Sequence, residues 1–503
     1  MNLFSGKYFQ SFSSKKNDTE NKNIKDRVVI VGAGQVGIHI MERLAEEGYN
    51  VVLIDENEEM VVKSREIADV ASIVGNGCNP KIYEEINLSN KDLFVAVTDS
   101  DETNLIACNI AQAFGCETKI ARVRKPFYKV DNNSYFNNQF WKKMGIEVLF
   151  NQDILTIEEI DHLIENPGAI DTVFLNNDLV QIVGYKVKAN SLLIGRRLIG
   201  IRDVPIFEHI LVVAINTGEN QTMNYTNKIL DKFKTADHNS SQMIIPRGDY
   251  KIKEGDLLYL AGKRNSFSGI SYLFDPKIVT EFNRIFILGG SILSHNLAEH
   301  LQKKYNDKKI FLIEKTKKGA YIASETLNPK INVLFMNAQD IESLKQEGMD
   351  RQSIFIAISP DEDENVLSSL VIKEDTMART IAMAQSSIYS HLIQYLDIDA
   401  AVSPKSLIVE DVLKALRKNV YDVLSAKGHD AEILEFVVPQ QSLMVNQQLR
   451  DIRFPANAII AFIFRQEEII VPRGDAIIKS DDHLVIFCLK SAISDIQNLF
   501  KDN

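Results

Sequence analysis

The sequence repeats its own motifs in the same order, and this duplication constrains its fold more than any other feature. The turn Pro246–Asp249 recurs as Pro472–Asp475, at an offset of 226 residues. A glycine-rich run that begins at Gly32 has a degenerate counterpart that begins at Gly289, at an offset of 257 residues. Because the motifs keep their order, we predict a tandem duplication of a two-part unit.

Length and composition limit the kinds of protein that this chain can be. With 503 residues it is too long for one hydrophobic core, and roughly three to five domains are expected. A net charge of −11 argues against a nucleic-acid partner. No apolar run approaches the roughly 18 residues of a membrane span. The four cysteines have no metal-ligand spacing and indicate a reducing compartment.

The first 24 residues differ from the rest of the chain because they are rich in Ser, Asn and Lys. This composition predicts a disordered tail. An interfacial membrane anchor is the alternative, since Leu3, Phe4, Tyr8, Phe9 and Phe12 could share one short amphipathic face. A secretory signal is excluded because no apolar region with a cleavage site is present.

From Arg27 onward, short apolar runs alternate with amphipathic stretches, which is typical of a parallel sheet covered by helices on both faces. The first helix is expected near residues 35–47, where Val36, Ile40 and Leu44 share one face. The predicted strands are Arg27–Val31, Val51–Ile54, Ser72–Val74, Leu93–Val97, Ile120–Val123 and Glu147–Phe150.

A glycine motif follows the first of these strands and opens the first helix. Gly32 permits the tight turn, Gly34 gives a diphosphate access to the backbone, and Gly37 allows close helix packing. Asp55 lies 21 residues beyond Gly34, where it can accept hydrogen bonds from ribose hydroxyls, and its charge favours NAD or NADH over NADP. A glycine turn without a ligand is the alternative. The predicted phosphate loop comprises Gly32, Ala33, Gly34, Gln35, Val36 and Gly37.

Two further loops follow strands at the edge where open parallel sheets bind ligands. Asn76 and Gly77 follow the third strand and are placed to pass under an adenine. The fourth strand leads into a loop that contains Thr98, Asp101 and Asn104. Helix capping by Ser100 or Asp101 would explain that loop equally well.

Two arginines end the fifth strand. Arg122 and Arg124 are two positions apart, so they share one side of an extended strand. They either clamp phosphate, within one subunit or across a subunit boundary, or form a solvated basic edge.

The segments after each predicted sheet have a different character. Strands are expected at residues 178–187, 210–216 and 256–260, a helix start at Ser191–Leu198, and a polar surface insertion at 218–242. Residues 430–503 repeat this pattern. We predict an α/β protein with two Rossmann-like, doubly wound parallel sheets in tandem, each followed by a small α+β module. The expected domains are 1–24 (tail), 25–150, 151–280 (crossover helix and module), 281–425 and 426–503.

Taken together, these motifs resemble the TrkA family, the regulatory subunits of Trk-type bacterial potassium uptake, with two RCK units. The likeness rests on Val29–Gly37, Ala96–Asn104, Lys119–Arg124 and the two Pro-Arg-Gly-Asp turns. It covers nearly everything beyond the first 24 residues. It implies a cytoplasmic gating ring that lies against the inner face of the cell membrane beneath a potassium-conducting subunit of the TrkH or TrkG type.

The resemblance also implies specific ligands and an assembly. The bound ligand would be NAD or NADH, with ATP or ADP as alternatives at the same site, and the ring would be a homo-oligomer such as a tetramer of tandem units. The glycines would hold the diphosphate and Asp55 the ribose. Thr98 and Asp101 would face the ligand, and Arg122 and Arg124 would reach its phosphates. The implied protein is not an enzyme.

The second copy departs from this pattern. Ser291 and Ser294 replace the second and third glycines, and Met383 and Gln385 stand where the first copy has Arg122 and Arg124. A side chain at Ser291 crowds the place of a diphosphate. We therefore expect the second copy to bind dinucleotide weakly or not at all.

Two other functions remain open on sequence grounds. An NAD-dependent oxidoreductase would need a proton donor or base at the nicotinamide, and the nine histidines are scattered outside any shared motif. A regulator of potassium efflux or of cation–proton exchange would share all the motifs, because the sequence does not name the pore.

Overall fold

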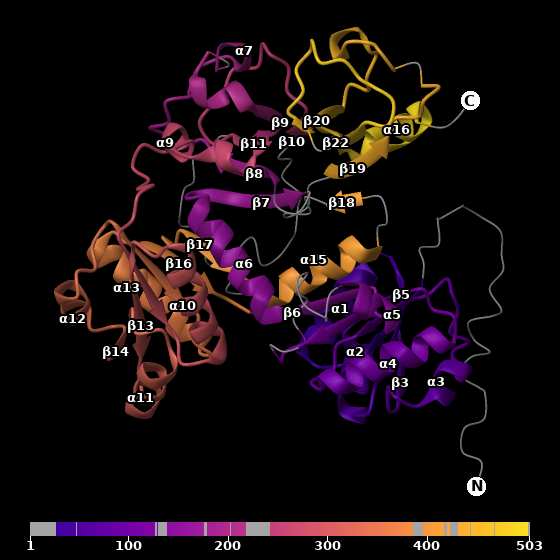
Figure 1. The fold of residues 1–503 in the computed structure, drawn as a ribbon, viewed down its shortest axis with the longest axis vertical. Helices are drawn as coiled ribbons and strands as arrows, with labels where there is room; N and C mark the ends of the chain where they lie inside the picture. Colours follow the sequence, from indigo (N-terminus) through magenta and orange to yellow (C-terminus); the bar gives the residue numbers. More distant parts are fainter. Residues whose placement is uncertain are drawn as a thin grey trace, which may run out of the picture. The chain divides into compact units, whose positions relative to one another are not determined.

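The structure is a computed structural model, and it describes residues 27–46, 48–125, 128, 138–175, 179–201, 203–217, 242–385, 396–416, 420–422, 431–442, 444–466 and 468–500. The chain divides into two compact units, residues 1–149 and 150–503 (Figure 1). The predicted tail at 1–24 and residues 218–241 of the predicted insertion lie outside the described residues. Among the helices that are described, none has the length and apolar character needed to cross a membrane.

The first unit contains a six-stranded sheet, here called the first sheet, in the order β3-β2-β1-β4-β5-β6. Strands β1 to β5 pair in parallel, as their continuous apolar runs predict. Its elements are β1 (Arg27–Val31), α1 (Gln35–Glu46), β2 (Asn50–Asp55), α2 (Glu58–Ile67), β3 (Ala71–Val74), α3 (Pro80–Glu85), β4 (Leu93–Ala96), α4 (Asp101–Ala113), β5 (Thr118–Val123), α5 (Asn138–Lys143) and β6 (Val148–Asn151).

The second sheet repeats this topology in the order β14-β13-β12-β15-β16-β17, with every pair parallel. The predicted fold class, two Rossmann-like sheets in tandem, is therefore confirmed. Its elements are β12 (Arg284–Leu288), α10 (Ile292–Lys304), β13 (Lys309–Glu314), α11 (Lys317–Thr326), β14 (Ile331–Phe335), α12 (Ile341–Gln346), β15 (Ser353–Ala357), α13 (Glu362–Thr376), β16 (Arg379–Met383) and β17 (Ala400–Val402).

A buried asparagine shows how closely the two sheets match. In the first sheet, Asn104 accepts a hydrogen bond from the Thr98 N–H at 2.8 Å and donates to the carbonyls of Thr98 and Arg122. In the second, Asn365 accepts from the Ser359 N–H at 2.8 Å and donates to the carbonyls of Ser359 and Met383. Each side chain thus joins the ends of two neighbouring strands.

The crossover helix α6 (Gln152–Glu165) covers the second sheet, although it follows the first sheet in the sequence (Figure 1). Its residues Ile157, Ile160 and Ile164 share one core with strands β12 to β17. Arg379, at the start of β16, donates hydrogen bonds to the carbonyls of Leu163 and Ile164 at the helix end. Helix α15 (Pro404–Leu416) packs beside α6.

Each sheet is followed by a small antiparallel module. The first has the strand order β10-β9-β11-β8-β7 and the second β18-β19-β22-β20-β21. Their elements are β7 (Ala169–Leu175), β8 (Val180–Lys186), α7 (Leu198–Ile201), β9 (Ile210–Thr217), β10 (Gln242–Ile244), β11 (Leu257–Lys263), α9 (Ser271–Phe274), β18 (Val420–Asp422), β19 (Ala431–Val437), β20 (Ala458–Arg465), β21 (Glu468–Ile470), β22 (His483–Leu489) and α16 (Ile493–Leu499).

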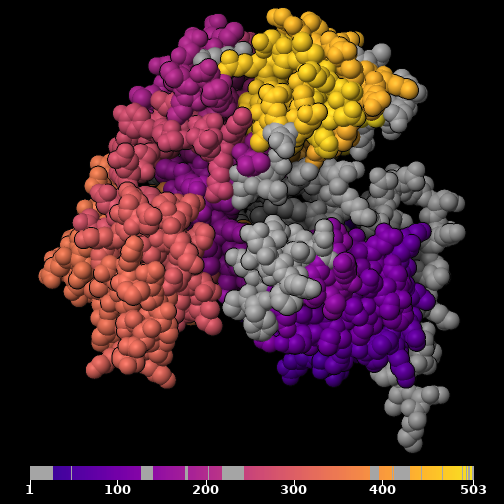
Figure 2. Space-filling view, viewed as in Figure 1, coloured from indigo at the N-terminus to yellow at the C-terminus, as the bar shows by residue number. Residues whose placement is uncertain are grey.

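The two modules pack against each other within the second unit. Residues from the antiparallel sheets of both modules, among them Tyr259 and Phe487, form one hydrophobic cluster. The side chain of Arg473, in the second Pro-Arg-Gly-Asp turn, donates to the carbonyl of Glu208 in the first module. Figure 2 shows the two modules meeting at the surface.

One element expectation in the first module was wrong. A helix start at Ser191–Leu198 was expected, but residues 192–195 form a turn, Arg197 forms an isolated bridge with Lys251, and helix α7 begins only at Leu198. Gly195 has φ +80°, which lies outside the helical region and ends any regular turn there.

Candidate functional site

The glycine loop of the first sheet closes tightly on itself. Gly32 has φ +110°, and a Cβ placed on it would lie 2.8 Å from the backbone nitrogen of Thr98. A Cβ on Gly37 would lie 1.8 Å from the carbonyl oxygen of Gly32. Both positions therefore require glycine for the fold itself, whatever binds there.

Gly34 differs from these two glycines because the fold does not require it. A Cβ at this position would meet no atom within 4 Å, and the residue is exposed. It lies directly before Gln35, the first residue of α1, where helix N–H groups point outward and carry partial positive charge. Bare backbone beside open space at a helix start fits a bound phosphate group.

Asp55 is held against the loop by two backbone hydrogen bonds. Its Oδ2 accepts from the N–H of Ala33 at 2.5 Å, and its Oδ1 accepts from the N–H of Asn57 at 2.8 Å. The side chain is half-buried at the end of β2. It is thus fixed beside the open side of the loop, where it can accept a further hydrogen bond from a ribose hydroxyl.

An exposed valine next to Asp55 escaped the sequence analysis. Val74 pairs with Asp55 across β2 and β3 and is 47% exposed. Close by, the Asn76 amide donates to Glu56 at 3.0 Å, and Gly77 is buried so tightly that a Cβ would lie 2.2 Å from Val31 Cγ1. Exposed apolar surface beside Asp55 suits the flat face of an adenine. The sequence signal for this surface is a strand that ends on a large apolar residue, Val74.

Two of the predicted site residues have their polar groups engaged inside the protein. Asp101 is 3% exposed, and its carboxylate accepts from the N–H groups of Arg124 and Lys125 at 3.0 and 2.9 Å. Asn104 is fully buried in the strand-joining role described above. Both residues position the loop that bears Thr98, whose half-buried hydroxyl donates to Asn104 Oδ1 at 2.7 Å.

The structure brings the two predicted arginines together on one acid. Arg122 Nη1 lies 3.8 Å and Arg124 Nη1 3.4 Å from Asp99 Oδ1, and the Asp99 side chain is 83% exposed. Arg124 also donates to the Asp99 carbonyl. The two guanidinium groups therefore flank the loop after β4, with the Arg122 side chain 11% and the Arg124 side chain 49% exposed.

Two groups near the glycine loop that could react covalently hold their protons at neutral pH. Burial raises the pKa of the Cys78 thiol, with a further contribution from Glu56. Burial also raises the pKa of the Tyr83 hydroxyl, which donates to the carbonyl of Gly77. In the part of the chain that the structure describes, no cluster of His, Cys, Asp or Glu could hold a metal ion.

At the second sheet, the same place is filled by the protein's own side chains. Ser291 caps α10 in a reciprocal pair with Ser294. Glu314, the counterpart of Asp55, is buried, and its Oε1 lies 3.3 Å from His295 Nε2. A Cβ on Gly290 would lie only 2.9 Å from Glu314 Oε2, so this carboxylate lies directly against the loop.

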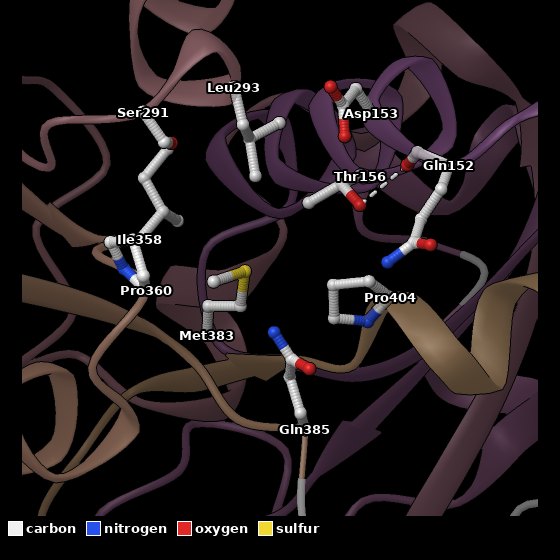
Figure 3. Close-up of a pocket in the computed structure, with 10 residues that line it drawn as sticks. All are labelled: Gln152, Asp153, Thr156, Ser291, Leu293, Ile358, Pro360, Met383, Gln385 and Pro404. Carbon is white, nitrogen blue, oxygen red and sulfur yellow. Dashed lines mark hydrogen bonds between the residues drawn. The ribbon is translucent and has the colours of Figure 1, made fainter. Parts of the chain in front are cut away.

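A cavity of about 190 Å³ remains beyond this loop (Figure 3). Met383 and Gln385 line it at the end of β16, where the first sheet has its two arginines. Leu293 and Met383 point into its centre, and the Thr156 hydroxyl of α6 donates to the Gln152 carbonyl at 2.8 Å. The lining is therefore a mixture of polar and apolar side chains and lacks the guanidinium groups of the first sheet.

Strand order, glycine loop and acid together define a protein with two Rossmann-type sheets in tandem. Comparison with known proteins agrees. The TrkA-N domain family matches residues 28–149 and 285–404, and the TrkA-C domain family matches 433–501. These matches cover more than half of the chain, which therefore belongs to the TrkA family.

Curated relatives match along nearly the whole chain. The Trk system potassium uptake protein TrkA homolog 1 of Methanosarcina mazei is 29% identical, over 94% of this chain and 100% of the relative. The TrkA protein of Halomonas elongata is 28% identical, over 94% and 98%.

Solved structures share the fold at low sequence identity. The RCK domain of GsuK has a TM-score of 0.55 at 16% identity and covers 96% of both chains. The GsuK channel bound to NAD has a TM-score of 0.54 at 15% identity, over 97% of this chain and 82% of that one.

Proposed function

We propose that this chain is the nucleotide-sensing regulatory subunit of a potassium uptake system, and that NAD or NADH binds at the first sheet. ATP or ADP would compete for the same place. The observation that carries the proposal is the open backbone at Gly34 beside the fixed carboxylate of Asp55. The relatives named as Trk potassium uptake proteins, and the NAD-bound GsuK channel of similar fold, support it.

The groups that surround the glycine loop of the first sheet define the proposed binding mode. The diphosphate would lie against Gly34 and the start of α1, and the adenosine would lie against Asp55 and Val74. Arg122 and Arg124 would exchange part of their contact with Asp99 for phosphate oxygens. A negative Asp55 would repel a ribose 2′-phosphate, so NADH should bind more tightly than NADPH.

Control of a channel requires that the nucleotide bind two states of the assembly unequally. We propose a cytoplasmic homo-oligomeric ring that contacts a potassium-conducting membrane subunit of the TrkH or TrkG type. We propose that the chain is a regulator and not an enzyme, and the reduced-nicotinamide assay below tests this.

Calorimetric titration of the purified full chain with NADH, NAD, ATP and ADP tests this proposal. Saturable binding by wild type that is lost in Gly34→Asp would support it. A parallel assay follows reduced-nicotinamide absorbance with candidate alcohols and 2-hydroxy acids. Absence of nucleotide binding, or sustained turnover of NADH, would overturn the proposal.

A further inference from the structure

The exposed residues that follow Asp55 in the first sheet and Glu314 in the second carry opposite charges. After Asp55, the first sheet carries Glu56, Glu58 and Glu59, all exposed. After Glu314, at an offset of 259 residues, the second sheet carries Lys315, Lys317 and Lys318, all exposed. The capping residue between them is retained in kind, since Asn57 caps α2 and Thr316 caps α11.

The lysines oppose the local stability of the helix that bears them. Lys317 and Lys318 are the first two residues of α11, where free N–H groups already carry partial positive charge. The corresponding Glu58 and Glu59 of α2 have the favourable sign. A helix start that carries charges of the unfavourable sign, with no compensating local interaction, is typical of a functional position.

The acid that would repel a phosphate is also buried at the second sheet. Glu314 is 3% exposed, and its carboxylate lies against Gly290, Gly319 and His295, whereas Asp55 is half-buried beside its open loop. Lys315 pairs with Glu364 at 3.1 Å. Within the described residues, Lys317 and Lys318 make no salt bridge, so both remain available to an anion from solution.

Two exposed aromatic side chains lie on β14 and on α11, the helix that bears the lysines. Phe335 pairs with Glu314 across β13 and β14, as Val74 pairs with Asp55, and it is 59% exposed. Tyr321, one turn along α11 from Lys317, is 67% exposed. Exposed aromatic rings beside cationic side chains are a common arrangement for stacking a base and holding its phosphate.

We propose that the second sheet binds a purine nucleotide that carries a phosphate on the 2′-oxygen of its ribose. The site is the rim formed by Lys315, Lys317, Lys318, Tyr321 and Phe335. The base stacks on Phe335, and the ribose phosphate meets Lys317 and Lys318. The diphosphate of a dinucleotide has no place here, because Ser291 and Glu314 fill the loop. This site is separate from the NAD site proposed for the first sheet. It favours a ribose 2′-phosphate, whereas Asp55 of the first sheet would repel one.

Titration of the full chain with adenosine 2′-monophosphate tests the proposal, with adenosine 5′-monophosphate and inorganic phosphate as comparison probes. In Gly34→Asp, where the proposed first-sheet site is disabled, the 2′-phosphate should bind best of the three probes. K317E/K318E should weaken that binding about tenfold or more, because two attractive charges become repulsive. F335A should weaken it by about tenfold through lost stacking, and Phe335→Tyr should restore it.

Two controls keep the outcome clear. K303E/K309E makes the same change in net charge at exposed positions near the opposite edge of the same sheet and should leave binding intact. Gly34→Asp should also leave it intact while NADH binding at the first sheet is lost. K317E/K318E should raise the thermal midpoint slightly, since acids suit the start of α11, so lost binding cannot be ascribed to unfolding.

Several results would overturn the proposal. These are no binding of the 2′-phosphate by wild type, equal loss in both double-lysine variants, or loss in Gly34→Asp. In Gly34→Asp, equal affinity for the 5′-phosphate or for inorganic phosphate would also refute it. A further arm uses vesicles of phosphatidylcholine with phosphatidylglycerol, and binding to these without binding of the nucleotide would assign the rim to a membrane surface instead.

Discussion

The two Rossmann-type sheets share strand order, capping residues and a buried asparagine with the same three partners, yet their ligand edges differ. At the first sheet, the acid is held at the rim and the loop is bare backbone. At the second, a longer acid turns inward, serines cap the helix, and lysines replace the glutamates outside. The scaffold of a duplicated domain is thus maintained by buried hydrogen bonds, while a few exposed positions change what the site accepts.

The largest expected difference between the sheets comes from one added carboxylate on each loop. Gly34→Asp should abolish NADH binding, with a loss of about 100-fold or more, because the charge would occupy the place of the diphosphate. The variant should fold, since a Cβ there meets nothing within 4 Å. Calorimetric titration measures the loss. Ser291→Asp is the matched control, and an equal loss from it would contradict the asymmetry.

A second comparison tests what the two sheets share. Asn104→Ala and Asn365→Ala should each destabilise their own unit by about 2–3 kcal/mol, because buried backbone groups lose their partners. The single tryptophan, Trp141, is buried in the first unit, so its fluorescence reports that unit's thermal unfolding. Asn104→Ala should shift this transition and Asn365→Ala should not. Equal shifts would show that the units unfold together.

A smaller effect is expected from the acids at the ends of β2 and β13. Asp55→Asn should weaken NADH binding by about tenfold and reduce the preference over NADPH, because the repulsion of a 2′-phosphate is removed. Glu314→Gln should leave NADH affinity unchanged, since this acid is buried at the other sheet. Competition titration with both nucleotides gives the ratio, and an unchanged ratio in Asp55→Asn would count against the ribose role.

The smallest effect concerns the attachment of α6 to the second sheet. Lys304 donates to Asp161 and Glu165 at 2.5 Å each. Burial would raise the pKa of Asp161, but hydrogen bonds from His300 and Lys304 outweigh it, and the pKa lies below the ordinary 3.8. Burial likewise opposes the lowered pKa of Glu165, which Arg264 and Lys304 hold below 4.5.

A carboxyl group whose pKa is lowered in the folded state stabilises the fold at pH values above its ordinary pKa. This stability is lost as the pH falls through the folded-state pKa. Lys304→Met should therefore lower the stability of the second unit by about 1–2 kcal/mol near pH 7, with the deficit shrinking below about pH 4. Calorimetric unfolding across this range measures it. A deficit that does not change with pH would mean that Lys304 acts through packing alone.

Much of this molecule could be predicted from its sequence. Continuous apolar strands such as Arg27–Val31 are typical of a covered parallel sheet, and the spacing from Gly34 to Asp55 predicts the site because strand and helix lengths bring acid and loop to one edge. The repeated turns predicted the duplication. All these signals are patterns of residue type and spacing along the chain, so they can be recognised without knowledge of tertiary contacts.

Other features depend on contacts between distant residues. Only the fold shows that Asp101 and Asn104 are occupied internally, that Val74 lies exposed beside Asp55, and that Glu314 turns inward. Only the fold assigns α6 to the second sheet. The sequence determined which residues could meet at an edge; burial and hydrogen bonds across tens or hundreds of residues decided which of them still face solvent, and no local pattern encodes that.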